Sequence, residues 1–186
     1  MQTPARVPSL VFPPELLLKA QGIRVVFFDV DGVLTDGGLY FSGEGEQLKR
    51  FCTLDGHGIK QLQKAGITPA VITGRDSAAL RNRLEALGLT HIHYGTENKR
   101  PAALQTLQAL GLNWGQAAAM GDDWPDLAVL HRCALAVAPA NAHPEVRAVA
   151  HYTTAAKGGE GAVREMCDLL LMASGRYADL YAEAMA

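Results

Sequence analysis

The stretch IRVVFFDVDGVLTD at residues 23–36 decides the fold of this 186-residue chain. Residues 23–30 are mainly β-branched and aromatic, and this run predicts a central parallel strand that is buried on both faces. The run ends in acids and a glycine, so the strand should deliver Asp29 to its carboxyl end. In open parallel sheets ligands bind at that edge, so Asp29 is the first candidate for a functional residue.

Strands and helices are expected to alternate along the rest of the chain. Further parallel strands are expected at residues 68–73, 91–94, 117–120, 134–138 and 150–153. Helical spacing predicts helices at residues 58–65, 77–87, 100–110, 125–131, 144–149 and 161–173. This alternation predicts an α/β fold with three layers, Rossmann-like, around a parallel central sheet.

One insertion interrupts the alternation. Residues 39–41 and 47–51 are expected to be short strands around a glycine-bearing turn at residues 42–46, which predicts a β-hairpin that projects from the sheet. Residues 1–186 are therefore expected to form a single domain with a hairpin insertion at 37–52. Residues 1–20 are expected to be an N-terminal appendage, and residues 174–186 a C-terminal tail.

Composition excludes several classes of function. With 17 basic and 19 acidic residues the formal charge is -2, which leaves no general field to attract nucleic acid or an anionic membrane. No apolar run is long enough to span a bilayer, and the first eight residues lack the features of a secretory signal, so a cytoplasmic location is expected. The three cysteines form no CxxC pair, and reduced thiols are expected.

Two acids at the first strand end suit phosphoryl transfer. Asp29 and Asp31 lie two residues apart on chain that leads into a loop, so both can reach one pocket while acting separately. We expect Asp29 to attack phosphorus, and Asp31 to protonate the leaving alkoxide and then deprotonate the hydrolytic water. Gly32 would let the backbone turn sharply after them.

An attacking carboxylate needs a cation to screen it from the anionic phosphoryl group, and Mg²⁺ meets that need. Mg²⁺ takes oxygen ligands, and the expected ligands are Asp29, the main-chain carbonyl of Asp31, and Asp122, together with waters and phosphate. Asp123 and Asp126, in the same tract, are expected to orient or support these ligands.

Two further segments are candidates for holding phosphate. Thr73 and Gly74 follow an apolar strand and open a helix, where a hydroxyl and backbone N–H groups stabilise anions. Lys99 begins another helix, and its ammonium could neutralise both the nucleophile and the transferring phosphoryl oxygens.

Each of these motifs also has a purely structural interpretation. The tract GDDWPD at residues 121–126 could be a strand-to-helix turn with an acidic N-cap, and this role is compatible with metal binding. Thr73 or Asp76 could simply cap the following helix. Lys99 alone is an ordinary surface residue by type, and the neighbouring Arg100 leaves open which side chain points inward.

Taken together, the motifs support a family resemblance. DxDGVxTD at residues 29–36, the Thr73 turn, Lys99 and GDDxxD at residues 121–126 resemble the four motifs of the haloacid dehalogenase superfamily of phosphatases. Large cap domains of that superfamily insert where this chain has only the hairpin at residues 37–52. The chain therefore resembles the capless members.

Three shorter motifs narrow the resemblance. DGxGI at residues 55–59, ITGR at 72–75 and GGxGAVRE at 158–165 are similar to those of capless phosphatases acting on 3-deoxy-D-manno-octulosonate 8-phosphate. The resemblance implies a Mg²⁺-dependent phosphoric monoester hydrolase of lipopolysaccharide sugar biosynthesis, a homotetramer whose neighbouring subunits cover the site. It carries substrate contacts onto Asp31, Cys52, Thr53, Leu54, Asp55, Gly56, Lys60, Arg75, Arg83 and Lys99.

The sequence is compatible with more than one substrate and with a non-catalytic role. Arg75 and Arg83 suit a substrate that carries a carboxylate besides its phosphate, but Cys52 and Lys60 stand where the family pattern has Asn and Arg. One alternative is a phosphatase for a nine-carbon, sialic-acid-like 9-phosphate or for sugar phosphates in general. Another is a non-catalytic, phosphatase-like assembly domain, against which the retention of the catalytic acids and Lys99 argues.

Overall fold

The computed structural model describes residues 10–186, and its centre is a six-stranded sheet in the order β5-β4-β1-β6-β7-β8 with every neighbouring pair parallel. The predicted α/β architecture with a parallel central sheet is confirmed. The strands are β1 (Val25–Phe28), β4 (Thr68–Ile72), β5 (His91–His93), β6 (Ala117–Met120), β7 (Leu135–Ala138) and β8 (Tyr152–Thr153).

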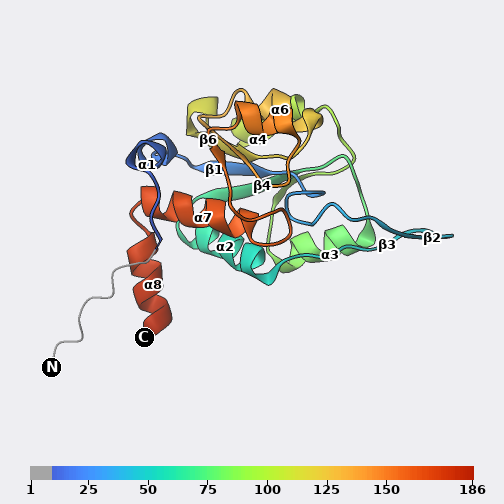
Figure 1. Ribbon diagram of the computed structural model, residues 1–186, viewed down its shortest axis with the longest axis horizontal. Helices are drawn as coiled ribbons and strands as arrows, with labels where there is room; N and C mark the ends of the chain where they lie inside the picture. The colour runs from blue at the N-terminus through green and yellow to red at the C-terminus, as the bar shows by residue number, and fades with distance from the viewer. Residues whose placement is uncertain (1–9) are drawn as a thin grey trace.

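Helices cover both faces of this sheet and make three layers (Figure 1). Above the sheet in that view lie α4 (Lys99–Leu110) and α6 (Pro144–Val149), and below it lie α2, α3 and α7. The remaining helices have the bounds α1 (Pro14–Ala20), α2 (Thr53–Lys64), α3 (Ala78–Ala86), α5 (Leu127–Leu130), α7 (Ala162–Ala173) and α8 (Tyr177–Met185), with 3₁₀ turns η1 (Trp114–Gln116) and η2 (Trp124–Asp126).

Alternate residues of β1 contribute to two separate cores. Val26 and Phe28 lie in the apolar cluster that β1 shares with α2, α3 and α7. Val25 and Phe27 lie in the second cluster, with α4, α5 and α6. All four side chains are buried, as expected for a strand covered on both faces, and this burial holds the strand's carboxyl end in place.

The helix that was expected at residues 58–65 begins earlier, at Thr53. Gly56 and Gly58 lower helix propensity, but a Cβ on Gly56 would lie 2.2 Å from Arg83 Nη2, and one on Gly58 would lie 3.0 Å from Cys167 Cβ. The two glycines therefore allow α2 to pack closely on α3 and α7. Tertiary packing overrides local propensity at this helix.

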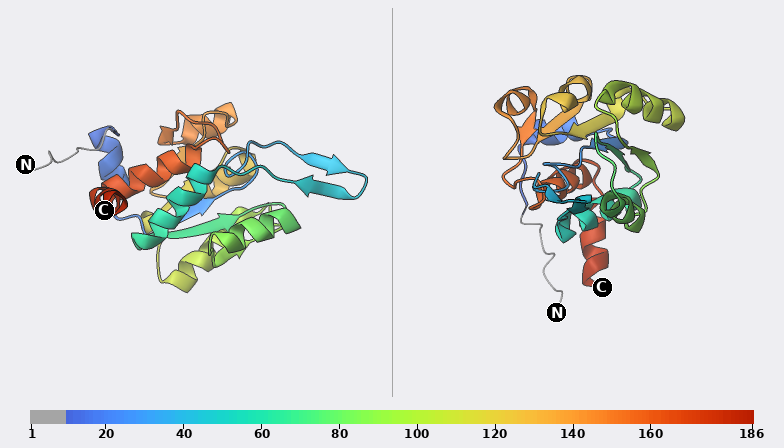
Figure 2. Two further views of the ribbon diagram at one scale, coloured as in Figure 1. Left: turned by 90° about the horizontal axis from the view of Figure 1, so that it is seen from below. Right: turned by 90° about the vertical axis from the view of Figure 1, so that its right-hand side faces the viewer.

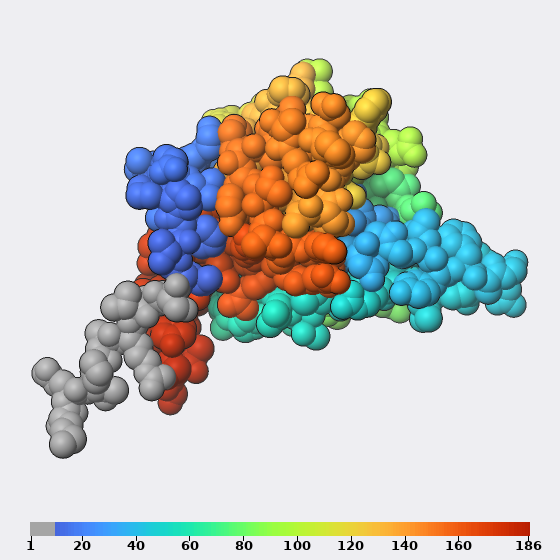
Figure 3. Space-filling model, in the orientation of Figure 1, coloured from blue at the N-terminus to red at the C-terminus, as the bar shows by residue number. Residues whose placement is uncertain are grey.

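The predicted hairpin projects from the end of the molecule (Figures 1 and 2). It consists of β2 (Tyr40–Ser42) and β3 (Gly45–Leu48), and Ser42 pairs with Gly45, so the turn is shorter than the five residues expected. The space-filling view shows it as a protrusion with little protein around its tip (Figure 3). Tyr40, Phe41 and Leu48 are exposed on it.

The two ends of the chain join the fold more closely than expected. Residues 10–20 of the expected N-terminal appendage include α1, whose Leu16 and Ala20 are buried against the core that contains α7. Residues 1–9 lie outside the described part. The expected tail forms α8, which contacts α7 and buries Leu180. Among the described residues no helix is long and apolar enough to cross a membrane.

Candidate active site

A cleft of about 430 Å³ lies at the carboxyl edge of the sheet. Asp29 follows β1 and donates its backbone N–H to Met120 O at the end of β6, at 3.1 Å. The structure therefore brings together Asp29 and the 121–126 tract, which the sequence predicts to share a Mg²⁺ ion. The residues that line the cleft are Asp29, Asp31, Gly74, Arg75, Glu97, Lys99, Asp122, Asp123, Pro125 and Asp126.

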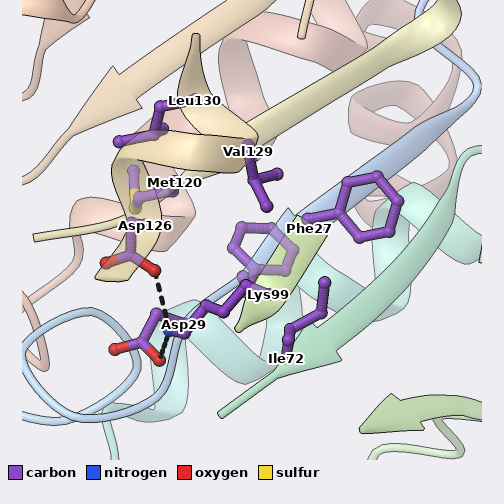
Figure 4. Close-up of a pocket in the computed structure, with 10 residues that line it drawn as sticks. Phe27, Asp29, Ile72, Lys99, Met120, Asp126, Val129 and Leu130 are labelled. Carbon is purple, nitrogen blue, oxygen red and sulfur yellow. Dashed lines mark hydrogen bonds and ion pairs between the residues drawn. The ribbon is translucent and has the colours of Figure 1, made fainter. Parts of the chain in front are cut away.

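Lys99 supplies the buried cation of this cleft. Its Nζ lies 2.5 Å from Asp29 Oδ1 and 2.7 Å from Asp126 Oδ1, and Figure 4 shows both contacts. Burial disfavours the charged ammonium, but the carboxylates of Asp29 and Asp126 outweigh burial and raise the pKa of Lys99. Arg100 is exposed, so Lys99 is the inward-pointing member of the pair.

Three carboxylates beside Lys99 crowd one another. Asp29, Asp122 and Asp126 each offer an oxygen, and these oxygens lie within 4.8 Å of one another. Burial, followed by the charges of Asp29 and Asp126, raises the pKa of Asp122 to about 8. Burial and the Asp126 charge likewise raise the pKa of Asp29, although Lys99 opposes the shift. A hard divalent cation would relieve this repulsion, so the donor set fits Mg²⁺.

A glycine allows Asp122 to enter the cluster. Gly32 has a φ of +91°, and a Cβ on it would lie 2.1 Å from Asp122 Oδ2. The sharp turn expected after Asp31 is therefore present, and it also leaves space for the second acidic tract. Any side chain at position 32 would displace Asp122.

The other acids of the 121–126 tract have clear structural partners. Asp126 Oδ2 accepts the backbone N–H of Asp122 at 3.0 Å and that of Asp123 at 3.3 Å. Asp123 Oδ1 accepts the N–H of Trp124 at 2.8 Å and caps η2. The capping interpretation thus holds for this turn. Asp126 has in addition its contact with Lys99, so it links the turn to the cation.

Thr73 directly follows β4 but does not open a helix. It is buried, and its Oγ1 accepts the backbone N–H of Arg75 at 3.2 Å. The following helix α3 begins only at Ala78, and Ser77 is its N-cap, so the expectation that a helix N-terminus lies at Thr73 and Gly74 is wrong. Asp76 caps nothing either, because it forms a bidentate ion pair with Arg81. Gly74 nevertheless lines the cleft.

Asp31 is held from two sides. Lys49 Nζ contacts Asp31 Oδ1, and Arg75 Nε lies 3.5 Å from Asp31 Oδ2. Lys49 comes from the base of the hairpin and was not anticipated from the sequence. Glu97, on the wall of the cleft next to Gly74, was not anticipated either. No local motif marks these two residues, because their positions depend on how distant segments pack.

The family resemblance implies several substrate-binding residues that do not line the cleft formed by the described residues of this chain. Arg83 Nη2 donates to Cys52 O at 3.3 Å. Asp55 Oδ1 accepts the N–H of Arg164 at 2.8 Å, at the start of α7. The residues found away from the cleft in this way are Cys52, Thr53, Leu54, Asp55, Gly56, Lys60 and Arg83.

The glycine-rich segment before α7 supports the loop that follows Asp31. Gly159 donates its N–H to Val33 O at 3.0 Å, and Gly158 donates to Asn141 Oδ1 at 2.7 Å. A Cβ on Gly158 would lie only 1.7 Å from Gly32 O. Backbone therefore packs directly on backbone here, beneath the loop that carries the acids.

Comparisons with known proteins agree with this arrangement. A profile of haloacid dehalogenase-like hydrolases matches residues 92–166. The 3-deoxy-D-manno-octulosonate 8-phosphate phosphatase KdsC of Yersinia pestis is 43% identical over 162 residues, 87% of each chain. The chain belongs to the haloacid dehalogenase-like family of phosphatases.

Solved structures of other family members superpose closely. The probable YrbI-family phosphatase of Pseudomonas syringae has a TM-score of 0.91 at 44% identity and covers 94% of this chain and 99% of its own. The phosphatase of Moraxella catarrhalis was solved with magnesium, phosphate and KDO, the sugar acid itself. It has a TM-score of 0.88 at 37% identity and covers 92% of this chain and 98% of its own. The family fold therefore extends over nearly all of the described chain.

Proposed function

We propose that this chain is a Mg²⁺-dependent phosphatase that hydrolyses 3-deoxy-D-manno-octulosonate 8-phosphate to the free sugar acid and phosphate, a step in making the lipopolysaccharide sugar KDO. The observation that carries the proposal is the Lys99 ammonium held between Asp29 and Asp126 at the floor of an acid-lined cleft. Relatives that are 43% identical bear this activity in their names.

The chemistry assigns separate tasks to the two acids of the first motif. Asp29 Oδ attacks phosphorus, and the bond from phosphorus to the sugar oxygen breaks as Asp31 gives that oxygen its proton. Asp31 then takes a proton from water, whose oxygen attacks the aspartyl-phosphate and restores the Asp29 carboxylate while phosphate leaves. Lys99 neutralises charge on Asp29 and on the phosphoryl oxygens throughout.

Mg²⁺ would be held by Asp29, Asp122 and the main-chain carbonyl of Asp31, and when bound it would neutralise phosphoryl charge during attack. Asp123 and Asp126 support the Asp122 turn. Thr73 and Gly74 would contact phosphate oxygens with a hydroxyl and backbone N–H groups, at a turn rather than at a helix end.

A sugar acid adds a carboxylate to the phosphate, and Arg75 is placed to meet it. Its side chain is 44% exposed at the mouth of the cleft, so one edge of the guanidinium is available for a planar anion. The M. catarrhalis relative was solved with KDO itself, which supports the eight-carbon sugar acid over a nine-carbon one.

We further propose that the protein works as a homotetramer in the cytoplasm. The hairpin exposes Tyr40, Phe41 and Leu48, an apolar surface that a second copy could cover. Lys60 and Arg83 do not line this chain's own cleft, and in a tetramer they would contact the substrate of a neighbouring subunit. Sizing by light scattering, compared with a Phe41→Glu variant, tests the assembly.

A substrate panel tests the activity. Phosphate release should be Mg²⁺-dependent and fastest with 3-deoxy-D-manno-octulosonate 8-phosphate, compared with arabinose 5-phosphate and a nine-carbon sugar-acid 9-phosphate. A preference for the nine-carbon compound would reassign the substrate. Absence of hydrolysis with all three would favour the non-catalytic assembly domain.

A further inference from the structure

Lys49 has a buried side chain and lies outside every motif of the sequence. Its side chain is 1% exposed, and its Nζ contacts Asp31 Oδ1 and lies 3.0 Å from Glu46 Oε1. A buried ammonium is stable only where nearby anions replace its hydration. Lys49 has two such anions, and one of them is the acid proposed to transfer protons.

Arg75 closes these contacts into a ring. Its Nε lies 3.5 Å from Asp31 Oδ2, and its Nη1 lies 4.0 Å from Glu46 Oε2. The order Asp31, Lys49, Glu46, Arg75 therefore alternates in sign and has no net formal charge. Lys49 donates a hydrogen bond to Asp31 Oδ1, whereas Arg75 only approaches Oδ2, so the carboxyl group is anchored through Oδ1 and Oδ2 is the oxygen that can carry the proton.

The two cations differ in what else they could do. Arg75 is partly exposed and lines the cleft, so it remains available to the substrate. Lys49 is buried and is absent from the lining of the cleft, so it cannot touch a bound phosphate directly. Lys49 can therefore affect the reaction only through its partners, directly through Asp31 or by way of Glu46 through Arg75.

The hairpin supplies half of this ring. Glu46 belongs to β3, and Lys49 follows β3 directly. The base of the hairpin is therefore attached to the reacting acid, while its tip projects away from the sheet (Figure 2). The insertion that stands in place of a cap thus contacts an acid that lines the cleft.

We propose that Lys49 is a positioning residue that holds the Asp31 carboxyl group toward the leaving oxygen of the substrate. This proposal rests on the proton-transfer role proposed above for Asp31. A sugar alkoxide is a poor leaving group and needs that proton as its bond to phosphorus breaks. A p-nitrophenolate leaves readily without one. Loss of Lys49 should therefore affect the two kinds of substrate unequally.

Lys49→Met tests the proposal because it keeps a long unbranched side chain and removes only the ammonium. For the sugar-acid phosphate, kcat/KM should fall by roughly 30-fold or more, within the range for general acid catalysis. For p-nitrophenyl phosphate, kcat/KM should stay within about three-fold, since it reports only the steps through phosphoryl transfer to Asp29. Lys49→Arg should restore part of the loss, because it keeps the charge.

Arg50→Met is the matched control. Arg50 is the next residue and contacts Asp36 at 3.3 Å, but its side chain is 55% exposed and it belongs to no part of the ring. Arg50→Met should change kcat/KM by no more than about two-fold for either substrate. If the Lys49→Met protein does not fold, Glu46→Gln takes its place, because it removes one of the two anions that hold Lys49. Glu46→Gln should also lower kcat/KM more for the sugar-acid phosphate than for p-nitrophenyl phosphate, but by a smaller factor.

An equal loss with both substrates, or no loss with either, would overturn the role of Lys49 and leave the phosphatase itself intact. A wild-type protein that hydrolyses neither substrate would instead overturn the proposed function. The two failures are therefore distinguishable in one set of assays.

Discussion

Lys99 Nζ lies 2.5 Å from Asp29 Oδ1, although 70 positions separate the two residues in the chain. The contact exists because β1 ends, and α4 begins, at the same edge of the parallel sheet. It pairs the proposed nucleophile with the one ammonium among the residues that line the cleft within the described chain. Figure 4 shows the pair beside the apolar side chains of Phe27 and Ile72, which line the same small pocket as Lys99.

Replacing Lys99 should therefore reduce catalysis more than binding. Lys99→Met should lower kcat by about 10²–10³-fold, the range for loss of one preorganised donor to developing charge. Lys99→Arg should not restore activity, because the planar guanidinium does not fit the space between Asp29 and Asp126. Steady-state kinetics on both variants gives the answer. Near-wild-type kcat in Lys99→Met would remove Lys99 from the mechanism.

The raised pKa of Asp122 predicts how the metal-free protein responds to pH. The pKa rises from 3.8 to about 8, so the folded state retains a proton that the unfolded state releases. Stability should therefore fall as pH increases from about 4 to about 8. Asp122→Asn should be more stable than the parent at pH 8 without metal, with roughly 2–4 °C in Tm for each kcal/mol gained. The difference should shrink toward pH 4.

Mg²⁺ provides the second half of that experiment. It should raise the Tm of the parent protein at pH 8, because it binds the folded state alone, and it should not raise the Tm of Asp122→Asn. Thermal unfolding across pH, with Mg²⁺ or with EDTA, measures both effects. An equal response to Mg²⁺ in the two proteins would show that Asp122 is not a ligand.

The glycine-rich segment gives a prediction with a close internal control. Gly159 and Gly111 have φ values of +67° and +66°, so alanine meets the same backbone strain at both, about 1 kcal/mol. A Cβ at Gly159 would also lie 2.4 Å from Asp36 N, whereas nothing lies within 4 Å of one at Gly111. Gly159→Ala should thus be less stable than Gly111→Ala by a further ~1–3 kcal/mol.

Activity should separate these two variants as well. The loop that Gly159 supports carries Asp31, and displacing it should lower kcat by at least roughly ten-fold. Gly111→Ala should retain wild-type kcat, since Gly111 caps the end of α4 opposite to Lys99. Chemical denaturation and kinetics on the same preparations test both statements. Indistinguishable variants would mean that the close approach at Gly159 does not constrain the loop.

Much of the fold could be predicted from the sequence because its strands are short apolar runs that end in polar residues. The apolar run at residues 23–30 predicts a strand, and β1 forms within it. Ligands bind at the carboxyl edge of a parallel sheet, so Asp29 and the 121–126 tract were expected to meet there, as they do. These inferences needed only local pattern and the topology of parallel sheets.

The remaining features depend on long-range packing. Thr53 could not be predicted as a helix start, because the glycines that weaken the helix locally are the ones that admit Arg83 and Cys167. The start of α3 is by contrast a local feature, because the Ser77 side chain accepts the N–H of Leu80, and it agrees within one residue with the helix expected at residues 77–87. Lys49 reaches Asp31 only because the chain returns from the hairpin beside the first loop, where Phe51 pairs with Thr35, and no motif encodes that contact.

The central claim is that Asp29 attacks phosphorus, and its most direct test is Asp29→Asn. The change removes the nucleophile's charge with little change in volume, so the folded structure should persist. Phosphate release from 3-deoxy-D-manno-octulosonate 8-phosphate in the presence of Mg²⁺ should fall to background, while circular dichroism stays that of the parent. Undiminished Mg²⁺-dependent phosphate release by a folded Asp29→Asn protein would contradict the mechanism.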